Sequence, residues 1–136
     1  MTEVVCDTSV VLKWFHDEGE QEVEEARALL EAHRTGRSTC WILELTFYEL
    51  GNVLLRSLGW HASDVADQLD DLRTICPVLT PAADALRLAS VLAEEHALTF
   101  YDALYAATAQ LHGAVLATAD KALLASSLGV RTGTLG

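Results

Sequence analysis

Short apolar runs of strand length alternate with longer segments of helical periodicity along this chain. The runs that fit strands are residues 3–6, 40–43, 77–79, 114–117 and 129–132, of which 40–43 fits the lead into a helix equally well. Strands separated by helices cannot pair through tight hairpins, so they are expected to lie parallel in a common sheet. The alternation therefore predicts an α/β fold with a mainly parallel sheet.

The intervening segments carry apolar residues at helical spacing. They predict helices over residues 8–15, 22–33, 44–58, 64–76, 80–95, 99–112 and 120–127. Ser63 is expected to cap the fourth of these helices, and Pro81 is expected in the first turn of the fifth. Gly59 and Gly113 are expected to end the helices that precede them.

The composition is that of a packed globular protein. The 136 residues are 51% hydrophobic, and the length suggests one domain spanning residues 1–136. No apolar run approaches the ~20 residues of a bilayer-spanning helix, and the N-terminus has no basic leader. Cys6, Cys40 and Cys76 form no C-x-x-C pair and adjoin apolar stretches, so buried reduced thiols are expected. We therefore expect a cytoplasmic protein that has no membrane partner.

The net charge of −11 limits the kinds of partner that the chain can bind. A broad nucleic-acid surface is not expected, because phosphate contacts rest on clusters of Lys and Arg. The charge does not exclude an enzyme that uses cations to meet a polyanion. It also favours a basic protein partner.

Four carboxylates stand at element ends or on apolar helices. Asp7 follows the first strand, Asp120 follows the fourth, Asp102 lies in the first turn of a helix, and Glu49 lies inside an apolar helix. Each has a purely structural explanation. Asp7 and Asp120 suit helix N-caps, Thr99 and Asp102 have the spacing of a capping box, and Glu49 suits a solvent-facing position. Taken singly, none of the four indicates a function.

Taken together, the four acids indicate a metal site. Parallel α/β sheets bind ligands beyond the carboxyl ends of their strands, where Asp7 and Asp120 are expected. Glu49 has apolar neighbours, and Asn52 on the same helix face can hold its side chain. Converging carboxylates repel one another and raise their own pKa values, a conflict that hard divalent cations remove. Oxygen-only ligands suit Mg²⁺ or Mn²⁺ rather than Zn²⁺.

The sequence lacks the residues that other common types of active site require. Ser9 has no partnered histidine or nucleophile-elbow motif, and there is no glycine-rich phosphate loop. A phosphoryl-accepting receiver domain needs paired acids after its first strand and an Asp at the end of a middle strand. This chain has Asp7 alone and Thr80 at those places. The histidines show no metal-ligand spacing and are expected at the surface or at helix ends: His16, His33, His61, His96 and His112.

Four motifs, in their order and separations, resemble those of the PIN-domain nucleases. They are VVCDTSVVLKWF, YELGNVLL, TFYDALYAATA and LATAD, and the resemblance runs from Val4 to about Val130. The branch that they resemble is the VapC toxins of prokaryotic VapBC toxin–antitoxin pairs. The resemblance implies a PIN-like three-layer α/β/α fold with a central, mainly parallel sheet of four to five short strands.

The resemblance also implies an activity and the residues that carry it. The implied activity is hydrolysis of RNA phosphodiester bonds by a metal-dependent endoribonuclease, which leaves a 5′-phosphate and a 3′-hydroxyl. The implied catalytic acids, which would bind Mg²⁺ or Mn²⁺ directly or through water, are Asp7, Glu49, Asp102 and Asp120. The implied supporting residues are Ser9, Asn52 and Thr118.

The same resemblance implies two protein partners: a VapB-like antitoxin that blocks the acidic pocket, and a second copy of the chain in a homodimer. A non-toxin PIN nuclease of RNA processing and a catalytically silent PIN-like binding module remain alternatives. The chain departs from the family at WILELT, where a proline is common. The cations near the motifs are Lys13, Arg56, Lys121 and Arg131, and Lys13 either contacts substrate phosphate or is a solvated charge.

Overall fold

A computed structural model describes residues 1–135 of the chain. The strands are β1 (Thr2–Cys6), β2 (Ser38–Leu43), β3 (Val78–Leu79) and β4 (Val115–Ala117). The α-helices are α1 (Thr8–Phe15), α2 (Val23–Arg34), α3 (Glu44–Asn52), α4 (Ala62–Ile75), α5 (Ala83–His96), α6 (Phe100–His112) and α7 (Lys121–Ala125). A π-helical turn, η1 (Val53–Ser57), continues α3, and a 3₁₀ turn, η2 (Thr132–Leu135), lies near the C-terminus.

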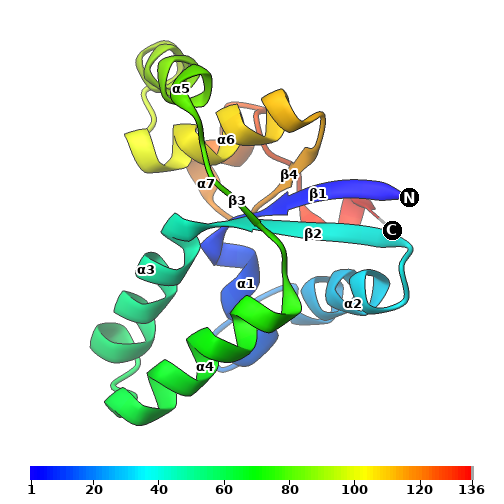
Figure 1. Cartoon of the computed structure of the whole chain (residues 1–136), viewed down its shortest axis with the longest axis vertical. Coiled ribbons are helices and arrows are strands. Elements are labelled where there is room, and N and C mark those ends of the chain that lie inside the picture. The colour runs from blue at the N-terminus through cyan, green and yellow to red at the C-terminus, as the bar shows by residue number, and fades with distance from the viewer. Residues whose placement is uncertain (136) are drawn as a thin grey trace.

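The four strands run parallel in the order β3-β2-β1-β4, with β1 between β2 and β4 (Figure 1). Val4 of β1 lies opposite Cys40 of β2 and Val115 of β4, which fixes the register of the sheet. The chain adds β2 and β3 on one side of β1 and then returns to place β4 on the other side. The strand order therefore reverses between β1 and β4, and parallel sheets bind ligands at such a reversal.

Helices cover both faces of the sheet, as the three-layer prediction requires. Helices α1 to α4 lie on one face and α5 to α7 on the other (Figure 1). Alternate residues of β1 enter different cores, since Val4 and Cys6 pack with α1 and α2 whereas Val5 packs with α6. This period of two follows from the pleat of a strand. Because both faces of each strand are buried, the strands are continuous apolar runs rather than alternating ones.

Most of the predicted elements are confirmed. Helix α1 has the predicted bounds, and six other predicted helices each have a counterpart in the structure. Gly113 ends α6 with a φ of 71° in the left-handed region, where glycine is the residue favoured by sterics. The three cysteines are buried and free, as expected. Within residues 1–135, no helix combines the length and apolarity needed to cross a bilayer.

The predicted fifth strand, residues 129–132, is wrong. Val130 forms a single parallel bridge to Ala117, after which the chain turns into η2. Gly129 weakens an extended run because it has no side chain to pack. The described sheet therefore has four strands, and Val130 contributes only one bridge, to Ala117 at the end of β4.

Three helix boundaries also differ from prediction. Residues 44–58 form α3 and then the π-helical η1, instead of one α-helix. Helix α4 begins at Ala62 after His61, so Ser63 lies inside the helix and is not its cap. Helix α5 begins at Ala83 after Ala82, which leaves Pro81 in the loop before it. The N-cap residues of α4 and α5 make no side-chain capping bond, so the preferred capping residue types did not mark where these two helices begin.

Candidate active site

Asp7 lies between β1 and α1, and it has two structural roles. Its backbone N–H bonds to the carbonyl of Ala117 in β4 over 3.3 Å, and its Oδ1 accepts from the backbone N–H of Val10 over 3.3 Å. Asp7 is therefore the N-cap of α1, as its structural explanation predicted. The cap and the strand together fix the carboxylate at the carboxyl end of β1.

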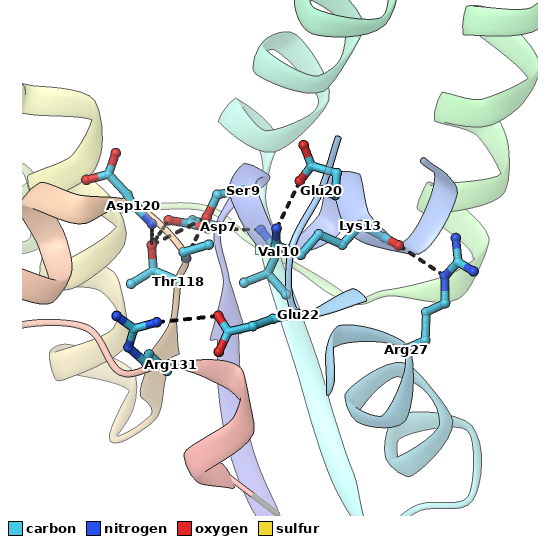
Figure 2. A network of polar contacts seen from close by, with 11 residues as sticks. Asp7, Ser9, Val10, Lys13, Glu20, Glu22, Arg27, Thr118, Asp120 and Arg131 are labelled. Atoms are coloured by element: carbon cyan, nitrogen blue, oxygen red, sulfur yellow. Dashed lines mark hydrogen bonds and ion pairs between the residues drawn. The ribbon is translucent and has the colours of Figure 1, made fainter. Parts of the chain in front are cut away.

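Two hydroxyl groups complete the surroundings of Asp7 (Figure 2). Ser9 donates to Oδ1 and Thr118 donates to Oδ2, each over 2.5 Å. Burial raises the pKa of Asp7 to about 6, although these hydroxyl donors and the Val10 N–H lower it, and the charge of Asp102 adds to the rise. A carboxylate offers about four lone-pair positions, and three donors leave room for one more partner.

The segment after β4 is tied to the same carboxylate. Ser9 Oγ accepts from the backbone N–H of Ala119 over 2.8 Å, and Thr118 Oγ1 accepts from that of Asp120 over 2.9 Å. Asp120 in turn caps α7 by accepting from the N–H of Leu123 over 3.0 Å. Each hydroxyl thus donates to Asp7 and accepts from the backbone beyond β4, which locks the two strand ends together (Figure 2).

Glu49 enters the site from α3. Its Oε1 accepts from the hydroxyl of Thr8 and from that of Tyr105, both over 2.8 Å. Asn52 is exposed and forms no hydrogen bond with Glu49 in the described structure, so the prediction that Asn52 holds this carboxylate is wrong. Glu49 is held instead by Thr8 of α1 and Tyr105 of α6.

Asp102 lies in the first turn of α6. Thr99 is the N-cap of this helix, and its hydroxyl accepts from the backbone N–H of Asp102 over 3.1 Å. The reciprocal bond of a capping box is not formed within residues 1–135, so the Asp102 carboxylate is not consumed as a cap. Burial raises the pKa of Asp102, the nearby charges of Asp120 and Glu49 raise it further, and the hydroxyl of Thr99 partly offsets the rise.

All four acids line one cavity of about 250 Å³ at the reversal point of the sheet. Its lining residues are Asp7, Thr8, Ser9, Leu12, Glu49, Val53, Asp102, Tyr105 and Asp120. None of these described lining residues is Lys, Arg or His. In residues 1–135, no three acidic, histidine or cysteine side chains are close enough together to hold a metal ion directly as they stand. Because four acids and no basic side chain of the described residues line it, the pocket is strongly acidic, and its volume is enough for several water molecules.

The model of the PIN domain family matches residues 4–126, which include all four acids. The chain belongs to the PIN-domain family. A relative that is 40% identical over 95 residues is a VapC protein of Pyrobaculum aerophilum named "Exonuclease VapC9". That match covers 65% of this chain and 67% of the relative, and it places this PIN domain among the VapC proteins.

Solved structures share the fold of this PIN domain. The crystal structure of PAE2754 from Pyrobaculum aerophilum has 31% sequence identity and a TM-score of 0.71, and it covers 98% of this chain and 86% of that one. A toxin–antitoxin complex from Klebsiella pneumoniae has 21% identity and a TM-score of 0.72, with 95% and 97% covered. VapC20 of Mycobacterium tuberculosis, a sarcin-ricin loop cleaving toxin, has 21% identity and a TM-score of 0.70, with 90% and 94% covered.

The cations near the motifs of this PIN domain do not line the pocket. Lys13 is buried, and its Nζ pairs with Oε1 of Glu20 over 2.9 Å, so it is neither a solvated charge nor a pocket residue (Figure 2). Arg131 pairs with Glu22 over 3.7 Å. The helical periodicity predicts the helix face on which Lys13 lies. It cannot predict that Glu20, in the loop after α1, pairs with Lys13.

Tyr105 is a polar pocket residue that the sequence analysis did not predict. It is almost fully buried in the apolar α6, where its spacing looks like that of an ordinary core residue. Its hydroxyl bonds to Glu49 and Thr46 over 2.8 Å and lies 3.1 Å from Thr8. A tyrosine three residues after Asp102 faces the same way as that acid, and this spacing was the one available signal.

Proposed function

We propose that this chain, a VapC-family PIN nuclease, hydrolyses RNA phosphodiester bonds in the acidic pocket with the help of Mg²⁺ or Mn²⁺. One observation carries the proposal. Carboxylates from four separate elements line a single pocket that lies where the strand order reverses, and no cationic side chain of residues 1–135 lines it. The ions would be held by Asp7, Asp102 and Asp120, with Glu49 holding a second ion or the attacking water.

The donor set fits a hard divalent cation. The pKa values of Asp7 and Asp102 are raised in part by neighbouring carboxylate charge, a repulsion that a bound cation relieves. The ligand atoms are carboxylate and hydroxyl oxygens, which Mg²⁺ and Mn²⁺ prefer. No three acidic, histidine or cysteine side chains of residues 1–135 are placed to hold an ion by themselves, so water molecules would complete its coordination. Mg²⁺ commonly keeps several of its waters.

The residues of the chain would divide the chemistry among them. Asp7 is held rigidly by Ser9 and Thr118, which spares reorganisation when charge develops. Glu49, whose Oε1 is already bonded, would use Oε2 to orient the water that attacks phosphorus. Departure of the 3′-oxygen then leaves a 5′-phosphate and a 3′-hydroxyl. A bound cation would lower the pKa of that water and offset charge on the phosphoryl oxygens.

Asp102→Asn tests the site with little risk to the fold, because the backbone rather than the side chain of Asp102 is used by the helix cap. RNA cleavage with Mg²⁺ or Mn²⁺ should fall by more than about 100-fold, since losing a direct ligand should exceed the 10- to 100-fold cost typical of outer-shell changes. Asp64→Asn is the matched control, because Asp64 lies in the first turn of α4 and is exposed outside the pocket. Equal cleavage by Asp102→Asn and wild type would refute the assignment.

The mode of cleavage needs its own test. The resemblance implies an endonuclease, whereas the relative at 40% identity is named an exonuclease. Circular single-stranded RNA separates the two modes, because only an endonuclease can open a circle. We expect the circle to be linearised and the ends to carry a 5′-phosphate. A circle that survives while the linear form of the same RNA is degraded would favour the exonuclease.

We also propose that a VapB-like antitoxin blocks this pocket. The similar fold of the Klebsiella pneumoniae protein occurs in a toxin–antitoxin complex, and the chain has a net charge of −11. A partner segment with a basic side chain would complement the acidic pocket. Cleavage by the purified chain should be lost on adding the protein encoded by the adjacent small reading frame. Cleavage that persists in a stable complex of the two proteins would count against this role.

A homodimer and a cytoplasmic location complete the proposal. Large apolar side chains are exposed on α5 and α6 at Leu86, Val91, Phe100, Tyr101 and Leu111. Such a surface is usual where proteins associate. The three free, buried cysteines of the described chain suit a reducing compartment. Light scattering after size exclusion should give twice the chain mass of 14.8 kDa.

A further inference from the structure

Glu49 is held by a chain of hydroxyl groups whose protons can be assigned. The backbone N–H of Leu43 donates to Thr46 Oγ1 over 3.1 Å. Because Tyr105 gives its only proton to Glu49, Thr46 is the donor in the 2.8 Å contact between the Thr46 and Tyr105 hydroxyls. Tyr105 then donates its own proton to Oε1 of Glu49, and Thr8 donates a second one, both over 2.8 Å. The hydroxyls of Thr46, Tyr105 and Thr8 each have one proton, and each proton is used in one hydrogen bond.

The direction of these bonds has a consequence for Glu49. A phenol has an ordinary pKa of about 10 and is protonated at neutral pH, so Tyr105 acts as a donor to the Glu49 carboxylate. Two donors converge on Oε1, and no partner within residues 1–135 takes Oε2. The carboxylate is therefore fixed by one oxygen and offers the other to the pocket that Glu49 lines.

We propose that Tyr105 is a positioning residue for the reaction, because its hydroxyl donates to Oε1 of Glu49 and so orients this carboxylate in the pocket. Thr8 is the second donor to Glu49, and Thr46 links Tyr105 to the start of α3. The inference rests on the proposed function only in giving Glu49 a part in catalysis. Outer-shell groups of this kind typically change metal affinity or activity by about 10- to 100-fold.

The chain offers a matched pair of tyrosine variants. Tyr105→Phe removes one buried hydroxyl and keeps the ring that packs in the core with Leu116 and Leu123. Tyr48 is 64% exposed, and Tyr48→Phe removes a hydroxyl whose hydrogen bond to Glu44 is long, at 3.4 Å. Tyr105→Phe should lower kcat by about 10- to 100-fold with KM for RNA unchanged, whereas Tyr48→Phe should match wild type.

A double-mutant cycle separates positioning of Glu49 from a general structural role. In a Glu49→Gln background, adding Tyr105→Phe should lower kcat by less than about twofold, since the group that Tyr105 orients is already disabled. Thr8→Val, which removes the other donor, should behave in the same way and serves if Tyr105→Phe does not fold. A similar loss from Tyr105→Phe in both backgrounds would overturn the proposal, and so would wild-type kcat in Tyr105→Phe when Glu49→Gln is slow.

A crystal structure of metal-free Tyr105→Phe gives a readout that is independent of turnover. The Glu49 carboxylate should leave its wild-type position or show two orientations, whereas in Tyr48→Phe it should keep one. An unmoved Glu49 in Tyr105→Phe would overturn the positioning role even if the rate falls. If the wild-type chain cuts no RNA under any condition, the proposed function fails, while this structural comparison still decides whether Tyr105 orients Glu49.

Discussion

The hydroxyl of Thr118 donates a hydrogen bond to Oδ2 of Asp7 over 2.5 Å, although 111 residues separate the two in sequence. The bond joins the segment after β4 to the end of β1, at the reversal of strand order. The same hydroxyl accepts from the backbone N–H of Asp120 over 2.9 Å, so one small side chain sets the relative positions of two pocket acids. Changes that displace Thr118 should therefore reach the whole pocket.

Gly129 provides such a change. A Cβ added to Gly129 would lie 2.5 Å from Cγ2 of Thr118, closer than real contacts allow. We expect Gly129→Ala to cost about 1–3 kcal/mol of unfolding free energy, as overpacking in a buried site does, and to reduce RNA cleavage by moving Thr118. Urea unfolding and cleavage assays measure the two effects.

Gly51→Ala is the control for this prediction. The added Cβ of Gly51 would meet Leu69 at an ordinary distance of 3.4 Å, and alanine suits a helix interior better than glycine. Unfolding free energy should therefore be unchanged or rise by about 0.5–1 kcal/mol. If Gly129→Ala proves as stable as Gly51→Ala, the close packing against Thr118 is not rigid.

The raised pKa of Asp7 predicts a pH dependence of stability in the metal-free protein. The pKa is about 6 in the folded chain and about 3.8 in its ordinary state, so the folded state binds more protons between these values. Stability from this group is present at pH 4 and is lost as pH rises to about 6, and the shift corresponds to roughly 3 kcal/mol. Asp7→Asn lacks this titration.

Urea unfolding in EDTA at several pH values checks the sign. The unfolding free energy of wild type minus that of Asp7→Asn should fall between pH 4 and about 6 and then level off. Asp64→Asn controls for the loss of an exposed acid. A difference that stays flat, or rises with pH, would show that burial does not raise the pKa of Asp7.

The local parts of this fold could be predicted from the sequence. An apolar run that ends in Asp7 and leads into α1 is decided by residues within reach of one another, and so is the cap that Thr99 places on α6. The position of Asp120 after β4 followed in the same way. The convergence of the acids also followed, because parallel strands must bring their carboxyl ends to one edge.

The partners of the site could not be predicted in the same way. Glu49 bonds to Tyr105, 56 residues away, and to Thr8, 41 residues away, and neither leaves a periodic signal. Asn52 was the local candidate, but it is exposed. Residue 130 carries a β-branched valine in a run of strand length, yet one bridge to Ala117 is all that the short β4 allows. Tertiary contacts decided each of these cases.

His33 lies in the last turn of α2, as expected, and its ring bridges α2, α4 and β2. Its Nε2–H donates to the carbonyl of Ile75 over 2.8 Å, and its Nδ1 accepts from the backbone N–H of Cys40 over 3.0 Å. His33→Ala would leave both backbone groups without these partners and should cost about 1–3 kcal/mol in urea unfolding. His96→Ala, at an exposed helix end, should cost little. Equal losses in the two variants would contradict the bridging role.

Lys13 and Glu20 form an ion pair whose two ends differ in exposure, with relative side-chain exposures of 7% and 24%. Glu20→Ala would leave a buried ammonium unpaired, and we expect a loss of about 3 kcal/mol. Lys13→Met would instead remove the buried charge, keep most of the side-chain volume and leave Glu20 partly in water, so its cost should be smaller. Neither residue lines the pocket, and RNA cleavage per folded molecule should stay at the wild-type level in both variants. A specific loss of cleavage in Lys13→Met, with stability retained, would restore Lys13 as a contact for substrate phosphate.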